Sequence, residues 1–316
     1  MSYAGPEFEP PPARRPRRRL IAVVGGAVVV GALAGWLAVQ GAGGPGGGGS
    51  RASGTAAPAG TASSASTPSG TASSSPSGDD RPGPAPTGAA PSGPLKGKVV
   101  VIDPGHNPEN FRHTADINKK VDIGTGRKEC DTTGTSTDDG YTEAEFTLDV
   151  AHRLRDLLEG QGATVKLTQD ADRPFGPCID ERARIGNEAD ADAVVSVHAD
   201  GSGAGNRGFH VILPGEVRAG AADTRAIVGP SRELGERIAG NFVRATGSAP
   251  SNYVGDGTGL VTREDLGGLN LSTVPKVFIE CGNMRDSKDA ALLTSGAWRQ
   301  AAARGISDGI VSFLRG

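Results

Sequence analysis

The chain has 316 residues, and its 33 Lys and Arg residues nearly balance its 36 Asp and Glu residues, giving a formal net charge of −3 at pH 7. No basic run occurs after residue 95, so the sequence gives no support to nucleic-acid binding. Composition changes sharply along the chain, which divides it into four segments: 1–19, 20–40, 41–95 and 96–316.

The first two segments together predict a membrane anchor. Residues 1–19 are polar and rich in arginine, whereas residues 20–40 contain no charged side chain. A helix of that length spans a hydrocarbon core of about 30 Å. Arginines on its N-terminal side place residues 1–19 in the cytoplasm and the remainder outside. The apolar run exceeds the usual core of a signal peptide, so we predict an uncleaved signal anchor, with a cleaved signal peptide and secretion as the alternative.

Residues 41–95 consist mainly of Gly, Ser, Ala, Thr and Pro. Such a segment has too little apolar mass to offset the entropy lost on ordering, so we predict a disordered linker. Residues 96–316 are numerous enough to form one domain with a substantial core. The linker would tether this domain away from the membrane.

The domain alternates predicted strands with predicted helices. Short apolar runs predict strands at 99–102, 164–168, 193–198, 208–213 and 276–280. Thr142 and Glu145 form a capping-box pattern for a helix that begins near Glu143 and ends before Gly160. Helical spacing of apolar residues predicts further helices at 179–188, 231–245 and 298–314. The fold class is therefore α/β, a single hydrolase-like domain whose mostly parallel central sheet is flanked by helices on both faces.

Residues 107–140 form a long polar stretch between the first strand and the first helix. A loop of this length in a compact domain is usually functional. It would either occlude the site or form part of a substrate groove, and the sequence leaves both interpretations open.

Two histidines and two glutamates occupy positions from which an active site of this fold class is built. His106 follows the first predicted strand, His198 and Glu280 end two later strands, and Glu143 opens a helix. Sites in open α/β sheets gather outside the carboxyl ends of the strands. Two imidazoles and one carboxylate are a ligand set of catalytic zinc, with a fourth position left for water. We therefore predict one Zn²⁺ at His106, Glu143 and His198, with Glu280 as general base.

Each of these residues also has a purely structural interpretation. A carboxylate such as Glu143 is stable at a helix N-terminus without any metal, and the capping box explains the rival ligand Glu145. A lone histidine such as His198 is more often a hydrogen-bonded core residue than a ligand. The presence of all four residues at one sheet edge favours the zinc site. The remaining histidines are predicted to be surface or loop residues: His113, His152 and His210.

The chain has three cysteines. Cys130 and Cys178 both lie in polar, loop-like stretches, and an exported domain permits a disulfide between them. Cys281 follows Glu280 in an apolar run, so we interpret it as a small core residue rather than a zinc thiolate.

Several of these segments recur together in one family. Val100 through His106, Glu143 at a helix start, and the segments at 181–187, 196–200 and 279–283 occur in the order seen in zinc-dependent N-acetylmuramoyl-L-alanine amidases of the amidase-3 family. The chain resembles this family over roughly 98–314. Segments 134–143 and 208–211 make it most similar to the actinobacterial, mycobacterial-type members.

The resemblance implies a site, a substrate and a location. Zinc would be bound by His106, Glu143 and His198, Glu280 would be the catalytic glutamate, and Cys130 would pair with Cys178. The enzyme would hydrolyse the amide between N-acetylmuramic acid and L-alanine in peptidoglycan, as a monomeric catalytic domain facing the cell wall. Two alternatives remain: another zinc peptidase acting on the stem peptide, such as a carboxypeptidase, and a non-catalytic wall-binding regulator.

Overall fold

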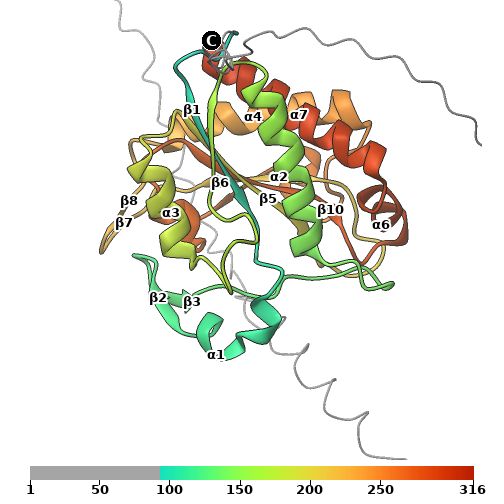
Figure 1. The fold of residues 1–316 in the computed structure, drawn as a ribbon, viewed down its shortest axis with the longest axis horizontal. Helices are drawn as coiled ribbons and strands as arrows, with labels where there is room; N and C mark the ends of the chain where they lie inside the picture. Colours follow the sequence, from blue (N-terminus) through green and yellow to red (C-terminus); the bar gives the residue numbers. More distant parts are fainter. Residues whose placement is uncertain (1–92) are drawn as a thin grey trace, which may run out of the picture. The chain divides into compact units, whose positions relative to one another are not determined.

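The computed structural model describes residues 93–316 (Figure 1). The predicted cytoplasmic segment 1–19, the predicted anchor 20–40 and residues 41–92 of the predicted linker lie outside the described residues. None of the helices within 93–316 combines the length and the apolar character needed to cross a membrane.

A six-stranded sheet forms the centre of the domain, with strand order β4-β1-β5-β10-β6-β9. Its strands are β1 (Val99–Pro104), β4 (Thr164–Leu167), β5 (Ala193–Asp200), β6 (His210–Pro214), β9 (Leu260–Arg263) and β10 (Lys276–Asn283). Neighbouring strands pair in parallel everywhere except between β10 and β6, which are antiparallel. The sheet is thus mixed but mostly parallel, which confirms the predicted α/β class.

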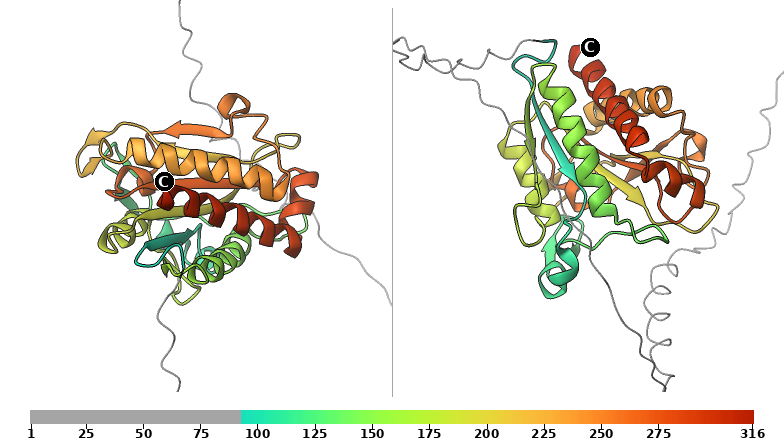
Figure 2. Two further views of the ribbon diagram at one scale, coloured as in Figure 1. Left: turned by 90° about the horizontal axis from the view of Figure 1, so that it is seen from above. Right: turned by 45° about the vertical axis from the view of Figure 1, so that its right-hand side comes forward.

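Helices cover both faces of this sheet. On one face, α2 (Glu143–Glu159) packs against β1, β4 and β5, while α4 (Val228–Thr246) packs against β6 and β10. Figure 2 shows α4 running beside α7 (Gly296–Arg315), and α6 (Ser287–Leu293) adjoins α7 and β10. On the opposite face, α3 (Ile179–Glu188) packs against β1 and the short α5 (Gly267–Asn270).

The strands divide their side chains between two different environments, because successive residues of a strand point to opposite faces. Val277, Ile279 and Cys281 join the large apolar core beneath α2, α4 and α7, as predicted for Cys281. The alternate residues of β10, Lys276, Phe278 and Glu280, point to the α3 face. One face of the sheet therefore supplies most of the core, and the other carries polar side chains.

The strands that carry His198 and Glu280 run further than the sequence predicts. β5 continues past His198 to Asp200, and β10 continues past Glu280 to Asn283, because Asn283 pairs with Asp200 beyond an irregularity in the register. His198 and Glu280 are consequently register partners inside the sheet rather than at strand ends.

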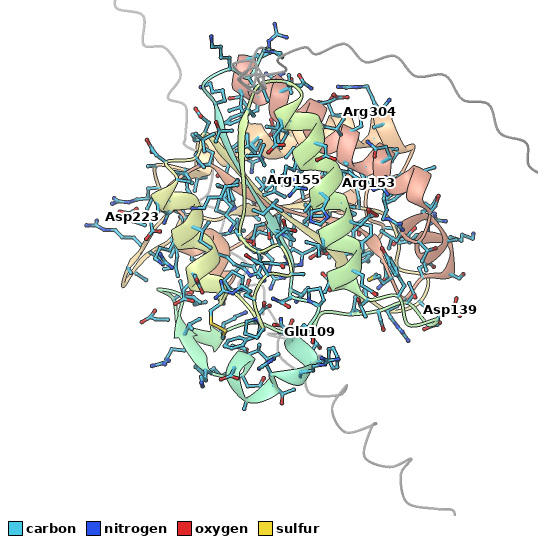
Figure 3. All side chains as sticks on the ribbon, in the orientation of Figure 1. Glu109, Asp139, Arg153, Arg155, Asp223 and Arg304 are labelled. Atoms are coloured by element: carbon cyan, nitrogen blue, oxygen red, sulfur yellow. A yellow bond between two sulfur atoms is a disulfide. The ribbon has the colours of Figure 1, made fainter. Side chains whose placement is uncertain are left out.

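The stretch 107–140, predicted as an unbroken loop, contains short elements: η1 (Asn110–Arg112), α1 (Thr114–Ile117), and a hairpin of β2 (Lys120–Asp122) and β3 (Arg127–Glu129). A disulfide joins Cys130, directly after β3, to Cys178, directly before α3, and Figure 3 draws sulfur–sulfur bonds in yellow. The remaining elements are the hairpin β7 (Arg218–Ala219) and β8 (Ala222–Asp223), and η2 (Gly255–Gly257).

Buried charges lie between the sheet and α3. Asp103 Oδ2 lies 3.1 Å from Lys276 Nζ, and Asp103 Oδ1 lies 2.8 Å from an Arg182 nitrogen. Burial favours the neutral acid, but the two cations outweigh it and hold the pKa of Asp103 far below its usual range. The charges are therefore mutually compensated, and removing one leaves its partner in a poor environment.

Replacing Lys276 by methionine is expected to lower the free energy of unfolding by about 3 kcal/mol, because the buried Asp103 loses one of its two compensating cations. The measurement is urea denaturation followed by circular dichroism. Lys98→Met is the matched control, since the Lys98–Asp192 ion pair is only half-buried and its loss is expected to cost about 0–1 kcal/mol. Equal effects of the two substitutions would contradict the prediction.

Candidate metal centre and catalytic site

His106 lies just beyond β1, with its backbone in the left-handed region at φ +62°. The Thr132 carbonyl lies 3.1 Å from His106 Nδ1. A carbonyl only accepts hydrogen bonds, so Nδ1 carries a proton there and Nε2 is the nitrogen available as a ligand. Nε2 lies 3.1 Å from Glu143 Oε1.

Glu143 is the first residue of α2, and the predicted capping box is present: Thr142 accepts from the Glu145 amide and Glu145 accepts from the Thr142 amide. The Glu143 side chain is buried and takes no part in the capping box. Its Oε2 accepts from the Thr135 amide at 3.0 Å, and its Oε1 accepts from the Ala199 amide at 3.2 Å. These bonds hold Oε1 between the two histidines.

His198 projects from β5, and its Nδ1 lies 2.9 Å from Glu143 Oε1. Its Nε2 lies 3.2 Å from Ser196 Oγ, which itself lies 2.8 Å from Asp103 Oδ2. The ionised Asp103 can only accept, so the Ser196 hydroxyl donates to it and accepts from His198 Nε2–H. Nδ1 is then the ligand atom of His198.

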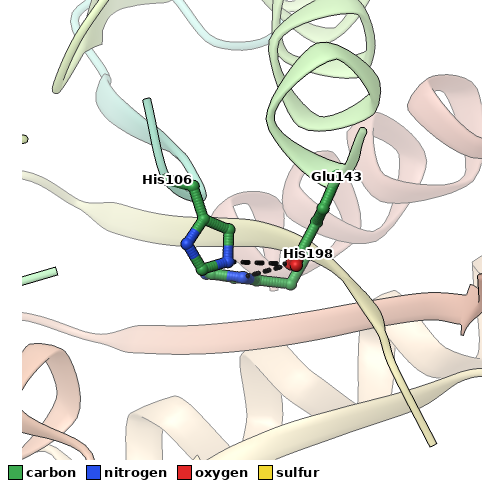
Figure 4. Close-up of side chains that lie close together, drawn as sticks. All are labelled: His106, Glu143 and His198. Atoms are coloured by element: carbon green, nitrogen blue, oxygen red, sulfur yellow. Dashed lines mark hydrogen bonds and ion pairs between the residues drawn. The ribbon is translucent and has the colours of Figure 1, made fainter. Parts of the chain in front are cut away.

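The three side chains thus converge from β1, α2 and β5, as Figure 4 shows. Their ligand atoms all lie within 4.8 Å of one another. Burial opposes ionisation, but the two histidines outweigh it and lower the pKa of Glu143 well below its usual range. One ionised carboxylate and two imidazoles, each with its second nitrogen hydrogen-bonded, form a donor set that fits Zn²⁺.

Glu280 lies on β10 beside this cluster, in register with His198 on one side and His210 on the other. Its Oε2 is buried and has no hydrogen-bond partner among residues 93–316. Burial raises the pKa of Glu280 well above its usual value, and the carboxylates of Glu143 and Asp200 raise it further. A carboxyl group that is unpartnered and has a raised pKa is suited to exchanging protons.

A cavity of about 190 Å³ adjoins the cluster on the α3 face of the sheet. His106, His198 and Phe278 line it from the sheet side, and the Phe278 ring stacks on His198 with centroids 5.1 Å apart. The segment 128–132 and the N-terminal part of α5 line the other side. The long polar stretch therefore forms one wall of the cavity.

Sequence reasoning identified the three side chains that converge here, and Glu280 beside them, but missed the groups that hydrogen-bond to them. Ser196 lies two residues before His198 on the same strand face, which is a signal that period-two alternation offers. The same alternation would have corrected the interpretation of His210, which is buried on β6 rather than at the surface. His152 does lie at the surface, as predicted.

Fold and site together define a class: an α/β domain with a His-Glu-His candidate metal site toward the carboxyl ends of its parallel strands. Comparison with known proteins specifies the family. The N-acetylmuramoyl-L-alanine amidase family matches residues 100–312. The N-acetylmuramoyl-L-alanine amidase Rv3717 of Mycobacterium tuberculosis is 41% identical over 222 residues, which cover 70% of this chain and 88% of that protein.

Solved structures agree with this match. The crystal structure of the N-acetylmuramyl-L-alanine amidase Ami1 from Mycobacterium smegmatis has a TM-score of 0.64 and 39% identity, covering 70% of this chain and 98% of that one. The apo form of Ami1 from Mycobacterium abscessus has a TM-score of 0.64 and 40% identity, covering 70% and 100%. This chain belongs to the amidase-3 family of N-acetylmuramoyl-L-alanine amidases. It is a peptidoglycan hydrolase. Its cell-wall substrate and its disulfide both indicate that it acts outside the cytoplasm.

Proposed function

We propose that this amidase is zinc-dependent, that His106, Glu143 and His198 hold the ion, and that Glu280 is the general base. The observation that carries the proposal is the convergence of His106 Nε2, Glu143 Oε1 and His198 Nδ1. Thr132 and Ser196 bind the other ring nitrogen of each histidine and so keep its proton away from the metal centre. Bound Zn²⁺ would supply Lewis acidity, which polarises a carbonyl and acidifies water. The bond cleaved is the amide between the lactyl group of N-acetylmuramic acid and L-alanine.

Residues of the chain would then supply proton transfer, substrate binding and the positioning of the ligands. Glu280 accepts a proton from the attacking water and returns it to the nitrogen of the departing L-alanine, as a base with a raised pKa can do. The cavity beside His106 and His198 accommodates the part of the substrate next to the scissile bond. Phe278 stacks on His198, which restricts the rotation of that ring.

The pH dependence of hydrolysis is expected to change when a charged residue near Glu280 is replaced, because such a charge shifts the pKa of Glu280. The base must be ionised, so kcat/KM rises as pH increases through the pKa of Glu280. The Asp200 carboxylate raises that pKa, so Asp200→Asn is expected to move the acid limb of the profile to lower pH. The measurement is kcat/KM against pH for both proteins. A limb that stays in place, or moves to higher pH, contradicts the assignment of Glu280 as base.

We also propose, from the sequence, that residues 20–40 anchor the enzyme in the membrane with residues 96–316 facing the cell wall. The basic residues before the apolar run support this orientation. Fractionation of cells that express the full chain tests it. Recovery of a shortened chain in the culture medium would favour a cleaved signal peptide.

The proposed function is tested by digesting purified peptidoglycan with the full-length chain, with Zn²⁺ or with a chelator, and determining the masses of the products. Release of stem peptides with a free N-terminal L-alanine, dependent on Zn²⁺, is the expected result. Stem peptides shortened at their far end would indicate a carboxypeptidase instead. No release by protein that demonstrably contains zinc would favour a non-catalytic role.

A further inference from the structure

Asp131 lies next to the proposed metal ligand His106 but is not itself positioned to bind the ion. It is buried, and its Oδ1 lies 3.5 Å from His106 Nδ1, the nitrogen that faces away from Glu143. The carbonyl of the next residue, Thr132, lies 3.1 Å from the same nitrogen. Asp131 and Thr132 therefore both contact the His106 ring at Nδ1, the nitrogen that faces away from the proposed metal centre.

A single guanidinium fixes both the Asp131 carboxylate and the backbone of His106. Arg182 Nη2 donates to Asp131 Oδ2 at 3.0 Å and to the His106 carbonyl at 2.9 Å. Its Nη1 donates to the Pro104 carbonyl at 2.6 Å. His106 has a positive φ, which is uncommon for a residue with a side chain and persists only where surrounding contacts hold it. Arg182 supplies such contacts, together with Gln169, whose Nε2 donates to the same His106 carbonyl at 3.1 Å.

The disulfide joins the two segments that meet in this arrangement. Cys130 directly precedes Asp131, and Cys178 directly precedes α3, the helix that carries Arg182. The Ile179 amide donates to the Cys130 carbonyl at 2.7 Å, and Arg182 Nε donates to the Pro177 carbonyl at 2.9 Å. The crosslink thereby restrains the position of Asp131 relative to Arg182, and so relative to His106.

We propose that Asp131 is a positioning residue for His106, that the Cys130–Cys178 disulfide holds it in place, and that together they set the affinity of the site for its metal ion. The inference rests on the proposed metal site. A carboxylate beside the second nitrogen of a metal-binding histidine fixes the orientation of the ring and strengthens it as a ligand. The disulfide thus contributes to the metal centre as well as to the stability of the domain.

The test is the dissociation constant for Zn²⁺, measured on the full-length chain by competition with a chromogenic chelator. Asp131→Ala is expected to raise this constant about 10- to 100-fold. Asp131→Asn keeps an acceptor oxygen and is expected to raise it less. The matched control is Asp116→Asn, in the same polar stretch but outside the cavity, whose carboxylate pairs with Lys119 and not with His106. It is expected to leave the constant unchanged.

The role of the disulfide is tested with the double variant Cys130→Ser/Cys178→Ser, alone and combined with Asp131→Ala. The serine variant is expected to weaken Zn²⁺ binding, and the combined variant to weaken it by less than the product of the separate effects. Ile310→Ala, in the apolar core between α4 and α7, provides a destabilised protein that retains every group around His106 and His198, and its affinity is expected to match that of the parent.

The outcomes separate this inference from the proposed function. If the parent chain does not bind Zn²⁺ and Glu143→Ala changes nothing, the metal site itself is wrong. If the parent binds Zn²⁺ but folded Asp131→Ala binds it within twofold of the parent, only the positioning role is overturned. If Ile310→Ala weakens binding as much as Asp131→Ala, the effect of Asp131 is one of stability, and the proposal fails.

Discussion

Replacing Glu280 by glutamine is expected to lower kcat by about 10²- to 10⁴-fold, the range that general base catalysis contributes. The substitution preserves the size of the side chain and removes its ability to take a proton. Glu280 lies beside the three converging ligand atoms and is not one of them, so bound zinc is expected to remain. The measurements are the rate of muropeptide hydrolysis and the zinc content of the purified variant.

The control for this prediction is His198→Ala, which removes a proposed ligand and is expected to lose zinc as well as activity. Together the two variants separate the chemistry of the base from the presence of the ion. Full activity in Glu280→Gln would exclude Glu280 as the base.

Gly105→Ala is expected to reduce kcat/KM by about 10²-fold or more, although it adds only a methyl group. A Cβ at this position would lie 2.3 Å from Cε1 and 2.5 Å from Nδ1 of His198, well inside van der Waals contact. Phe278 stacks on the His198 ring, so the ring has little room to yield without leaving its place. Misplacing a catalytic group by about 1 Å is enough to cause a loss of this size.

The matched control is Gly126→Ala, because a Cβ there meets no heavy atom within 4 Å. It is expected to leave hydrolysis and zinc retention at the level of the parent. Gly105→Ala is expected to retain zinc poorly in a chelator competition, since Nδ1 is the proposed ligand atom of His198. Parent-like activity in this variant would contradict the geometry described for the site.

The positions of the site residues could be predicted because they follow from local patterns. An apolar run ending in a histidine, or a capping box preceded by a polar stretch, is visible in a few consecutive residues. His106 and Glu143 lie where these patterns place them. The strands that carry His198 and Glu280 end later than predicted, because the pairing of Asp200 with Asn283 depends on a neighbour distant in sequence.

The supporting groups could not be predicted for the same reason. Arg182 contacts Asp103, Asp131 and the His106 carbonyl, which are brought together only by the packing of α3 on the sheet. A charged residue that begins an apolar strand, as Lys276 does, signals a buried ion pair but does not reveal its partner. The short helices and strands within 107–140 likewise depend on contacts with distant segments, such as the disulfide to Cys178, which cannot be deduced from the polar composition of this stretch.

Side chains of β10 point alternately to the core and to the site, so the position of Glu280 depends on the register of this one strand. A shift of one position would turn Glu280 into the apolar core and bring Cys281 to the site, because side chains have a period of two. Insertion or deletion of one residue between Lys276 and Glu280 is therefore expected to disrupt the core and the site together. We therefore expect the segment from Lys276 to Glu280 to tolerate substitutions but not changes of length.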